Sequence, residues 1–547
     1  MPSISPFAAV TTAIAVGGIV ELLRIGRRDS DLPPGPPTKP VVGNLPDFPL
    51  SEPHLRFAEW AKKYGEIFSL KMANGTIVVL NTPQAVRFVL DTKNSVTADR
   101  PDFFVINYVT SNLHLGFIKY GPTWRTLRKA ATEILNVKAC TRHLPIQYAE
   151  SAQLLYDLVM EPEEHYTLCH RYSSSVVMSI VFGQRIPQMS SQLAKGLAQN
   201  SADLDHLVKP GNTPPIDLIP AFKYIPERWA KWKTFCNESR DRHRDYYDDL
   251  VGGCERRLQN GTGNGCFIET LLERKEELGT TREMIMYLGE ALVEPGSDST
   301  KTFLQNLILL LLTHPHVQEK AKNELDKVVG TDRLPTLDDI KDLPYIKAVH
   351  DEVNRLRPFG PLGLPHSASE EFHYNNYRIP KDSTIFINVW AIYHDENLFD
   401  EPNTFNPDRY LSNPLGVKDD VDIKEISNIK DLVFGAGRRV CPGMHLGKSS
   451  IILNTARILW AFDILKAKNA DGSVIEPNFM DCHPTSSNAP APFKCDIRPR
   501  SDKHKQLICR EFLDAMTTTS LFEQELMDAD KEFMRNARVK AEHVVFE

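Results

Sequence analysis

One cysteine of this 547-residue chain stands in a setting that its other eight cysteines do not share. Cys441 lies in the stretch FGAGRRVCPGMHLGKSS, where glycines and two arginines precede it and a helical pattern follows. A phosphate-binding loop would need G-x-x-x-x-G-K-[ST], but GMHLGKS has only three residues between its glycines, which excludes that site. A buried structural thiol remains the simpler alternative, although it leaves the unusual neighbours unexplained.

The residues around Cys441 suit a thiolate. Phe434, Gly435 and Gly437 predict a tight turn beside an aromatic ring, and Pro442 is typical of the first turn of a helix. A sulfur just before a helix receives backbone N–H groups and the positive end of the helix dipole, which favour its deprotonated form. The pattern therefore predicts a metal-binding cysteine.

The segment FGAGRRVCPG resembles the haem-binding loop of the cytochrome P-450 superfamily, because every fixed position of F-G-x-G-x-R-x-C-x-G is matched. The resemblance implies that Cys441 is the axial thiolate of haem b, with Phe434 and Arg439 among the cofactor-binding residues. A thiolate ligand pushes electron density onto the iron and favours cleavage of the O–O bond.

Two further segments match positions that contact the haem propionates in similar sequences. Trp124 and Arg128, in GPTWRTLRKA, match the family's W-x-x-x-R and lie one helical turn apart. The resemblance makes both residues donors to a propionate, a role that suits a guanidinium. Without the cysteine loop, a half-buried tryptophan and a solvated arginine would be the simpler interpretation. His366 and Arg439 are expected to be further propionate contacts.

One glutamate and two arginines predict a structural network. Glu352 and Arg355, in DEVNRLRP, are three residues apart and share one helical face. This pair is common on surface helices and means nothing alone, but Arg409, in FNPDRY, matches the arginine that accompanies it in the family. The resemblance implies a buried Glu352–Arg355–Arg409 network.

The segment PGSDST, Pro295 to Thr300, matches the family's oxygen-activation region with two departures. The resemblance makes Asp298, Ser299 and Thr300 catalytic, with Asp298 as the acid and Ser299 in place of the usual threonine. Serine keeps the hydroxyl that relays protons but lacks the methyl group that stiffens threonine. Pro295 replaces alanine and is expected to kink the helix, while Gly296 is expected to leave room beside the haem.

The elements that must position these residues are mostly helical. The sequence FAEWAKKYG predicts a helix ending at Gly65, and the strands IFSLKM and TIVVL flank the hairpin signal Asn74-Gly75. Residues 85–356 are mainly helical in pattern, and TIFINVWAI predicts another strand region at 384–392. The expected class is mainly α (α+β), the cytochrome P-450 fold: a large helical domain with small β-sheets.

The two ends of the chain add segments to this domain. Phe7 to Val20 is apolar and is followed by arginines, an order that favours an N-terminal transmembrane anchor over the alternative, a cleaved signal peptide. The predicted organisation is a membrane anchor at 1–28, a proline-rich linker at 29–45, a haem-thiolate catalytic domain at 46–499, and a C-terminal helical extension of unknown role at 500–547. This predicts a single-pass protein of the endoplasmic reticulum membrane with a cytoplasmic catalytic domain.

Composition excludes other classes of function. The net charge is −7 and the pI is near 6.2. Because phosphate binding requires a basic surface, these values argue against nucleic acid as a partner. The nine cysteines are odd in number and form no C-x-x-C pair, which favours a reducing compartment over a disulfide framework and disfavours a structural zinc site.

The resemblance implies a monooxygenase that inserts one oxygen atom of O₂ into a lipophilic small molecule, as in microsomal-type fungal members. No flavin or nicotinamide motif is present, so the electrons of NADPH must arrive through a reductase, and cytochrome b5 is a further possible donor. Two alternatives remain: a haem-thiolate isomerase or dehydratase that needs no reductase, and a non-catalytic haem-binding protein.

Overall fold

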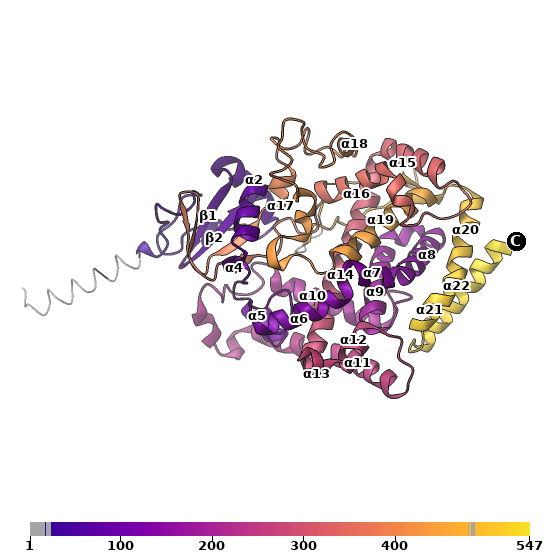
Figure 1. The fold of residues 1–547 in the computed structure, drawn as a ribbon, viewed down its shortest axis with the longest axis horizontal. Coiled ribbons are helices and arrows are strands. Elements are labelled where there is room, and N and C mark those ends of the chain that lie inside the picture. Colours follow the sequence, from indigo (N-terminus) through magenta and orange to yellow (C-terminus); the bar gives the residue numbers. More distant parts are fainter. Residues whose placement is uncertain (1–16, 18–22, 480, 483–486, 547) are drawn as a thin grey trace, which may run out of the picture.

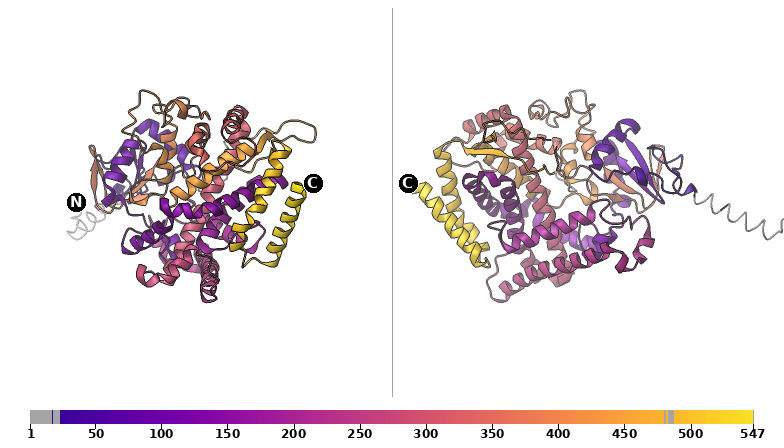
Figure 2. Two further views of the ribbon diagram at one scale, coloured as in Figure 1. Left: turned by 45° about the vertical axis from the view of Figure 1, so that its right-hand side comes forward. Right: turned by 180° about the vertical axis from the view of Figure 1, so that it is seen from behind.

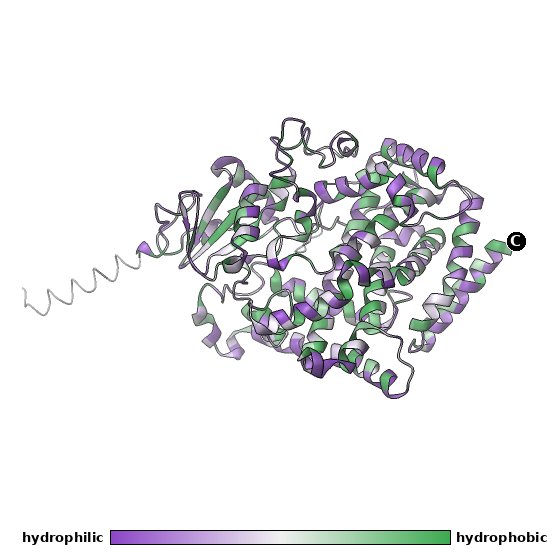
Figure 3. Ribbon diagram, viewed as in Figure 1, coloured by the Kyte–Doolittle hydropathy of each residue, from purple (hydrophilic) through white to green (hydrophobic). Residues whose placement is uncertain are grey.

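Helices make up most of this computed structural model, which describes residue 17 and residues 23–479, 481–482 and 487–546. The four-stranded sheet lies near the N-terminal end of the molecule, and helices fill most of the rest (Figure 1). The interior helices carry long hydrophobic segments, whereas α15 at the edge is largely hydrophilic (Figure 3). The predicted class, mainly helical with small sheets, is therefore confirmed.

The helices differ widely in length, and the longest two cross the body of the molecule. Those before the long helix α14 are α2 (Pro53–Tyr64), α3 (Pro83–Val86), α4 (Asn94–Thr97), α5 (Phe104–Val109), α6 (Pro122–Leu135), α7 (Val137–Cys140), α8 (Leu144–Met160), α9 (His165–Phe182), α10 (Gln192–Val208), α11 (Lys231–Gln259), α12 (Phe267–Glu273) and α13 (Lys275–Leu278). The others are α14 (Arg282–Thr313), α15 (Pro315–Val328), α16 (Pro344–Leu356), α17 (Val389–Tyr393), α18 (Arg409–Ser412), α19 (Met444–Ala461), α20 (Asp502–Asp514), α21 (Met516–Thr519) and α22 (Asp528–Phe546).

The main sheet has four strands in the order β1-β2-β6-β3. Its strands are β1 (Ile67–Met72), β2 (Gly75–Leu80), β6 (Thr384–Ile387) and β3 (His366–Ser367). The first two are antiparallel and confirm the predicted hairpin, but Met72 pairs with Gly75, so the turn is Ala73-Asn74 rather than Asn74-Gly75. The parallel pairing of β2 with β6 joins the N-terminal hairpin to the segment that carries His366.

Two smaller sheets complete the strand content. They are β4 (Phe372–Tyr374) with β5 (Tyr377–Ile379), and β7 (Phe462–Lys466) with β8 (Cys495–Pro499). The predicted strand region at 384–392 is only half correct, because the chain turns into α17 after β6. The side chain of Asn388 accepts a hydrogen bond from the Ala391 N–H and so caps that helix.

The helix α14 is the centre of the hydrophobic core and packs most extensively on α9. It continues without interruption through Pro295, whose missing N–H removes one backbone hydrogen bond. A Cβ atom at Gly296 would lie 2.9 Å from Val177 Cγ1 on α9. The expected role of Gly296 is thus corrected, because its missing side chain allows the two helices to pack closely.

The predicted network of Glu352, Arg355 and Arg409 is present and buried. Both nitrogens of the Arg355 fork donate to the Glu352 carboxylate, at 2.7 and 2.8 Å, and Arg409 Nε donates to it at 3.2 Å. Arg355 also donates to the carbonyl oxygens of Tyr393 and Pro402. The network therefore fixes α16 against the chain that leads to the cysteine loop.

The C-terminal extension is helical as predicted, and it is part of the folded body. Its helices α20 to α22 lie at the end of the molecule opposite β1 and β2 (Figures 1 and 2). The Phe512 ring stacks on Tyr156 of α8 with ring centroids 4.1 Å apart, and the Tyr156 hydroxyl donates to the Ala537 carbonyl at 2.8 Å. Two ion pairs add to this contact, Arg185 with Glu523 and Arg257 with Glu525, both at 2.6 Å.

The N-terminal anchor falls largely on residues 1–16 and 18–22, which lie outside the described residues. Within the described part of the chain, no helix combines the length and apolar character needed to cross a membrane. The proline-rich linker is fixed to the body, because the Arg28 guanidinium donates to the carbonyls of Gly35, Pro36 and Ser69, each at 2.9 Å.

Truncating Phe512 tests whether the extension stabilises the catalytic body. Because Phe512 is buried against Tyr156, we expect Phe512→Ala to lower the free energy of unfolding of the full chain by about 3–5 kcal/mol. Urea denaturation followed by circular dichroism measures the change. Leu521→Ala, at a side chain that is 53% exposed, is the control and should change stability by less than about 0.5 kcal/mol.

The buried network gives a second prediction. We expect Arg355→Met to destabilise the protein by about 3–5 kcal/mol, because it leaves the Glu352 carboxylate buried without its main partner. The matched control is Arg333→Met, which removes an ion pair between Arg333, whose side chain is 48% exposed, and Asp339. This variant should lower the free energy of unfolding by no more than about 1 kcal/mol. Equal losses in the two variants, in the same urea assay, would contradict the interpretation.

Candidate functional site

The loop that carries Cys441 is shaped by two glycines. Gly435 and Gly437 have φ of 81° and 65°, which disfavour any residue with a side chain. A Cβ atom at Gly437 would also lie 2.3 Å from the Leu90 carbonyl oxygen. The Gly437 N–H donates to Asp91 Oδ1 at 2.9 Å, which ties the loop to the segment before α4.

Cys441 lies at the end of this loop, two residues before the cap of α19. Its N–H donates to the carbonyl of Phe434 at 2.9 Å. The helix begins at Met444 with Gly443 as its N-cap, so Pro442 lies before the helix and the expected first-turn position is corrected. The Phe434 ring is partly buried and has the Lys448 ammonium 5.4 Å from its centroid.

Burial raises the pKa of the Cys441 thiol. The Gly443 N–H and the positive charge of Arg128 act in the opposite direction but do not outweigh it. The helix N-terminus therefore favours the thiolate as expected, but burial is the larger effect on the pKa of Cys441. A bound metal cation would supply the missing stabilisation, since a coordinated thiol loses its proton.

Trp124 and Arg128 lie one turn apart on α6, and both have unused hydrogen-bond donors. Neither the indole N–H nor the guanidinium donates to any residue that the structure describes. Trp124 is buried, Arg128 is partly buried, and burial lowers the pKa of Arg128. An open hollow of about 450 Å³ runs along this side of α6. A partly buried cation and a buried indole N–H are both stabilised by a hydrogen-bond acceptor, so these donors fit an anionic ligand.

Arg439 is buried and held by backbone carbonyls. It donates to Ala98 at 2.8 Å and Ile118 at 2.9 Å, and its guanidinium lies 4.5 Å from the centroid of the Trp124 ring. Burial lowers the pKa of Arg439 to about 10, and the positive charge of Arg128 adds to this. Arg439 therefore positions Trp124 and contributes positive charge to the same region.

Arg100 is a further buried arginine in this region, and the sequence analysis missed it. Its guanidinium donates to the carbonyls of Gly116 at 2.9 Å and Pro365 at 2.8 Å. Burial lowers its pKa to about 9, and the neighbouring Arg439 lowers it further. Arg100 stands in ADRPDF, where no spacing pattern distinguishes it from a surface arginine.

His366 is buried on β3, and its Nδ1 lies 2.9 Å from the Thr97 carbonyl oxygen. Burial lowers the pKa of His366 to about 3, so the ring is neutral with its proton on Nδ1. Nε2 is then an acceptor. The predicted contact with a propionate stays a prediction: burial disfavours the protonated ring, whereas a carboxylate beside Nε2 would favour it.

The three residues expected to handle oxygen occupy consecutive positions on α14 but have different surroundings. Asp298 accepts from Lys301 Nζ at 2.6 Å, and its side chain is 34% exposed. Ser299 is partly exposed, and its hydroxyl makes no hydrogen bond to the described residues. Thr300 is buried. Pro295, four residues before Ser299, is exposed, so the side of α14 that carries these two residues is accessible to solvent.

The residues present fit a haem group. One thiol can serve as the axial ligand, and Trp124 and Arg128 offer unused donors to a carboxylate. Asp99 is the carboxylate whose charge offsets Arg100 and Arg439 in the described part of the chain, so the three arginines leave a positive excess. The two propionates of haem b would neutralise that excess.

Comparisons with known proteins also point to a haem-binding protein. Residues 33–485 match the family model described as cytochrome P450. A cytochrome P450 monooxygenase of Armillaria gallica is 40% identical over 96% of this chain and 100% of its own length. A cytochrome P450 monooxygenase of Rhodocybe pseudopiperita is 36% identical over 94% of this chain and 99% of its own length. One of Penicillium expansum is 33% identical over 92% of this chain and 95% of its own length. The chain belongs to the cytochrome P450 family.

Proposed function

We propose that this protein is a haem-thiolate monooxygenase that oxidises a lipophilic small molecule. In the reaction RH + O₂ + NADPH + H⁺ → ROH + H₂O + NADP⁺, one oxygen atom enters the product and the other leaves as water. The observation that carries the proposal is the Cys441 thiol, with the unpaired Trp124 and Arg128 donors beside it. Haem, when bound, would supply the oxygen activation that a thiolate ligand favours.

The chain's own residues would hold the cofactor by its iron and by its carboxylates. Cys441 would supply the thiolate ligand, and the Gly443 N–H would stabilise its negative charge. The donors of Trp124 and Arg128 would bind a propionate, with Arg439 packed behind them. Arg100 would add positive charge near the propionates without having to contact them.

Proton delivery would depend on Ser299 and Asp298. The Ser299 hydroxyl makes no hydrogen bond within the described part of the chain and lies on the accessible side of α14, so it can donate to a reacting oxygen. Asp298 is held by Lys301 and can exchange protons with solvent, because its side chain is 34% exposed. Thr300 is buried and would have a supporting role.

Electrons would come from NADPH through a reductase that docks on the side of the cysteine loop. Arg438 and Arg125 are exposed there and flank the Tyr120 ring, at 5.5 and 5.7 Å from its centroid. Exposed cations of this kind steer an acidic partner. Cytochrome b5 would be a second donor to the same surface. An anchor at residues 1–28 would place the domain on the cytoplasmic face of the endoplasmic reticulum membrane.

The substrate would be apolar and would enter beside the loops at 103–120, 216–224 and 359–365. Phe103 and Phe117 pack edge to face there, with centroids 5.1 Å apart. The segment 484–489 would be a fourth, and it falls partly outside the described residues. Because the similar proteins are named as fungal monooxygenases, a place in fungal secondary metabolism or xenobiotic oxidation is proposed.

Turnover with labelled oxygen tests this function. The full chain, loaded with haem and supplied with reductase and NADPH, should incorporate one ¹⁸O atom per product molecule from ¹⁸O₂ on a lipophilic surrogate. The reduced protein with carbon monoxide should show the strongly red-shifted Soret band of thiolate ligation, and Cys441→Ser should lose it. Conversion of an organic hydroperoxide without reductase, with no ¹⁸O uptake, would instead establish an isomerase.

Substituting Ser299 tests proton delivery. We expect Ser299→Ala to lower the product formed per NADPH by about tenfold and to raise hydrogen peroxide release, because a proton donor is lost. Ser299→Thr should keep the coupling. Ser297→Ala, which removes a fully buried hydroxyl two residues away, is the matched control. Unchanged coupling in Ser299→Ala would show that Thr300 or water delivers the proton.

A further inference from the structure

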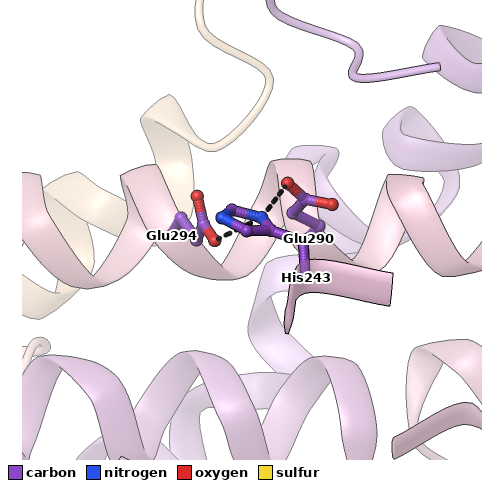
Figure 4. Close-up of side chains that lie close together, drawn as sticks. All are labelled: His243, Glu290 and Glu294. Carbon is purple, nitrogen blue, oxygen red and sulfur yellow. Dashed lines mark hydrogen bonds and ion pairs between the residues drawn. The ribbon is translucent and has the colours of Figure 1, made fainter. Parts of the chain in front are cut away.

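A group of ionisable side chains lies between α11 and α14, outside the site described above. His243 comes from α11, and Glu290 and Glu294 come from successive turns of α14. Figure 4 shows the imidazole ring between the two carboxylates. Within the described part of the chain, these three residues form a group whose ligand atoms all lie within 4.8 Å of one another.

All three side chains are removed from solvent. His243 and Glu290 are 0% exposed, and Glu294 is 4% exposed. His243 Nδ1 lies 2.9 Å from Glu290 Oε1 and 3.9 Å from Glu294 Oε1. Two carboxylates are thus buried around a single imidazole, an arrangement that is unfavourable unless their charge is neutralised.

The group has more hydrogen-bonding capacity than its surroundings use. Among the described residues, one oxygen of each carboxylate, Glu290 Oε2 and Glu294 Oε2, has no partner, and neither has His243 Nε2. From outside the group, the Tyr247 hydroxyl donates to Glu294 Oε1 at 2.9 Å. Since buried polar atoms are normally satisfied, the unused atoms indicate a missing partner at this point.

We propose that His243, Glu290 and Glu294 bind one Zn²⁺ ion. A neutral imidazole and two carboxylates carry a charge of −2, which a divalent cation balances. Ligand atoms around tetrahedral Zn²⁺ lie about 3.3 Å apart, and the two measured separations fall on either side of that value. A water molecule would take the fourth position, as in other three-ligand zinc sites.

The chemistry of the ligands selects Zn²⁺ over the common alkaline-earth ions. Ca²⁺ requires six to eight oxygen ligands, and Mg²⁺ keeps an octahedral shell with several waters. Three ligands, one of them an imidazole nitrogen, suit neither ion but suit zinc. The Tyr247 hydroxyl would orient Glu294 from outside the coordination shell, as supporting hydrogen bonds do in zinc proteins.

Protons offer a competing way to neutralise the same group. Although burial opposes it, the hydrogen bond with Glu290 and the nearby negative charges raise the pKa of His243 to about 9. Burial, with the charge of Glu290, raises the pKa of Glu294. A protonated cluster would thus be neutral without metal, and the experiment must separate the two states.

The metal content of the purified, haem-loaded full chain is the direct test. The protein is expressed with Zn²⁺ in the medium, dialysed against a chelator that removes surface metal, and analysed by plasma mass spectrometry. We expect about one zinc per chain beside the haem iron. Absorption at the zinc edge, where the haem iron does not interfere, should give one nitrogen and two or three oxygen neighbours at about 2.0–2.2 Å.

Stability gives a readout that needs no variant. Zn²⁺ added to metal-depleted protein should raise the Tm by at least about 2 °C, whereas Mg²⁺ and Ca²⁺ should not. If the wild-type protein retains no zinc and its Tm does not respond, the group is a proton-bound cluster and the proposal is overturned.

Variants assign the ion to these residues. The double variant Glu290→Gln and Glu294→Gln preserves the shape of both side chains and should lose the bound zinc. Glu283→Gln, on the same helix at a side chain that is 43% exposed, is the matched control and should retain it. A double variant that binds haem and still holds one zinc per chain would refute the assignment.

Discussion

Desolvation of the partly buried Cys441 sulfur is the constraint on which the rest of the site depends. The protein alone does not favour the ionised thiol, because desolvation outweighs the Gly443 N–H and the charge of Arg128. A metal cation bound to the sulfur would reverse that balance. The glycine loop and the donors of Trp124 and Arg128 on α6 therefore fit a site for a metal complex that carries negative charge at its edge.

Buried charge recurs at a distance from this site, and each time it joins segments that are far apart in sequence. Glu352 links α16 to the chain before the cysteine loop through Arg355 and Arg409. Glu150 of α8 accepts from Arg185, which in turn pairs with Glu523 of the C-terminal extension. Such networks are costly to bury but more costly to break, so they fix one arrangement of the helices around the cofactor.

The sequence predicted those features whose signals are local. The cysteine loop, the first hairpin and the Glu352–Arg355 pair each lie within a short segment with characteristic spacing. The role of Arg100 was not predictable, because one of its partners is the Leu364 carbonyl, 264 residues further along the chain. The residue pattern around Cys441 indicates the helix N-terminus that favours a thiolate, but it does not indicate the desolvation that raises the pKa of the thiol. The group around His243 has no local motif, since it forms only where α11 crosses α14.

The docking of the C-terminal helices has a consequence for recombination between related enzymes. The family model ends at residue 485, yet Tyr156, Arg185 and Arg257 of the body all bind residues beyond that point. A chimaera that joins the body of one relative to the tail of another would set mismatched surfaces against each other at this seam. Successful exchange of parts would have to transfer the tail together with the matching faces of α8 and α11, so these segments should be inherited as a unit.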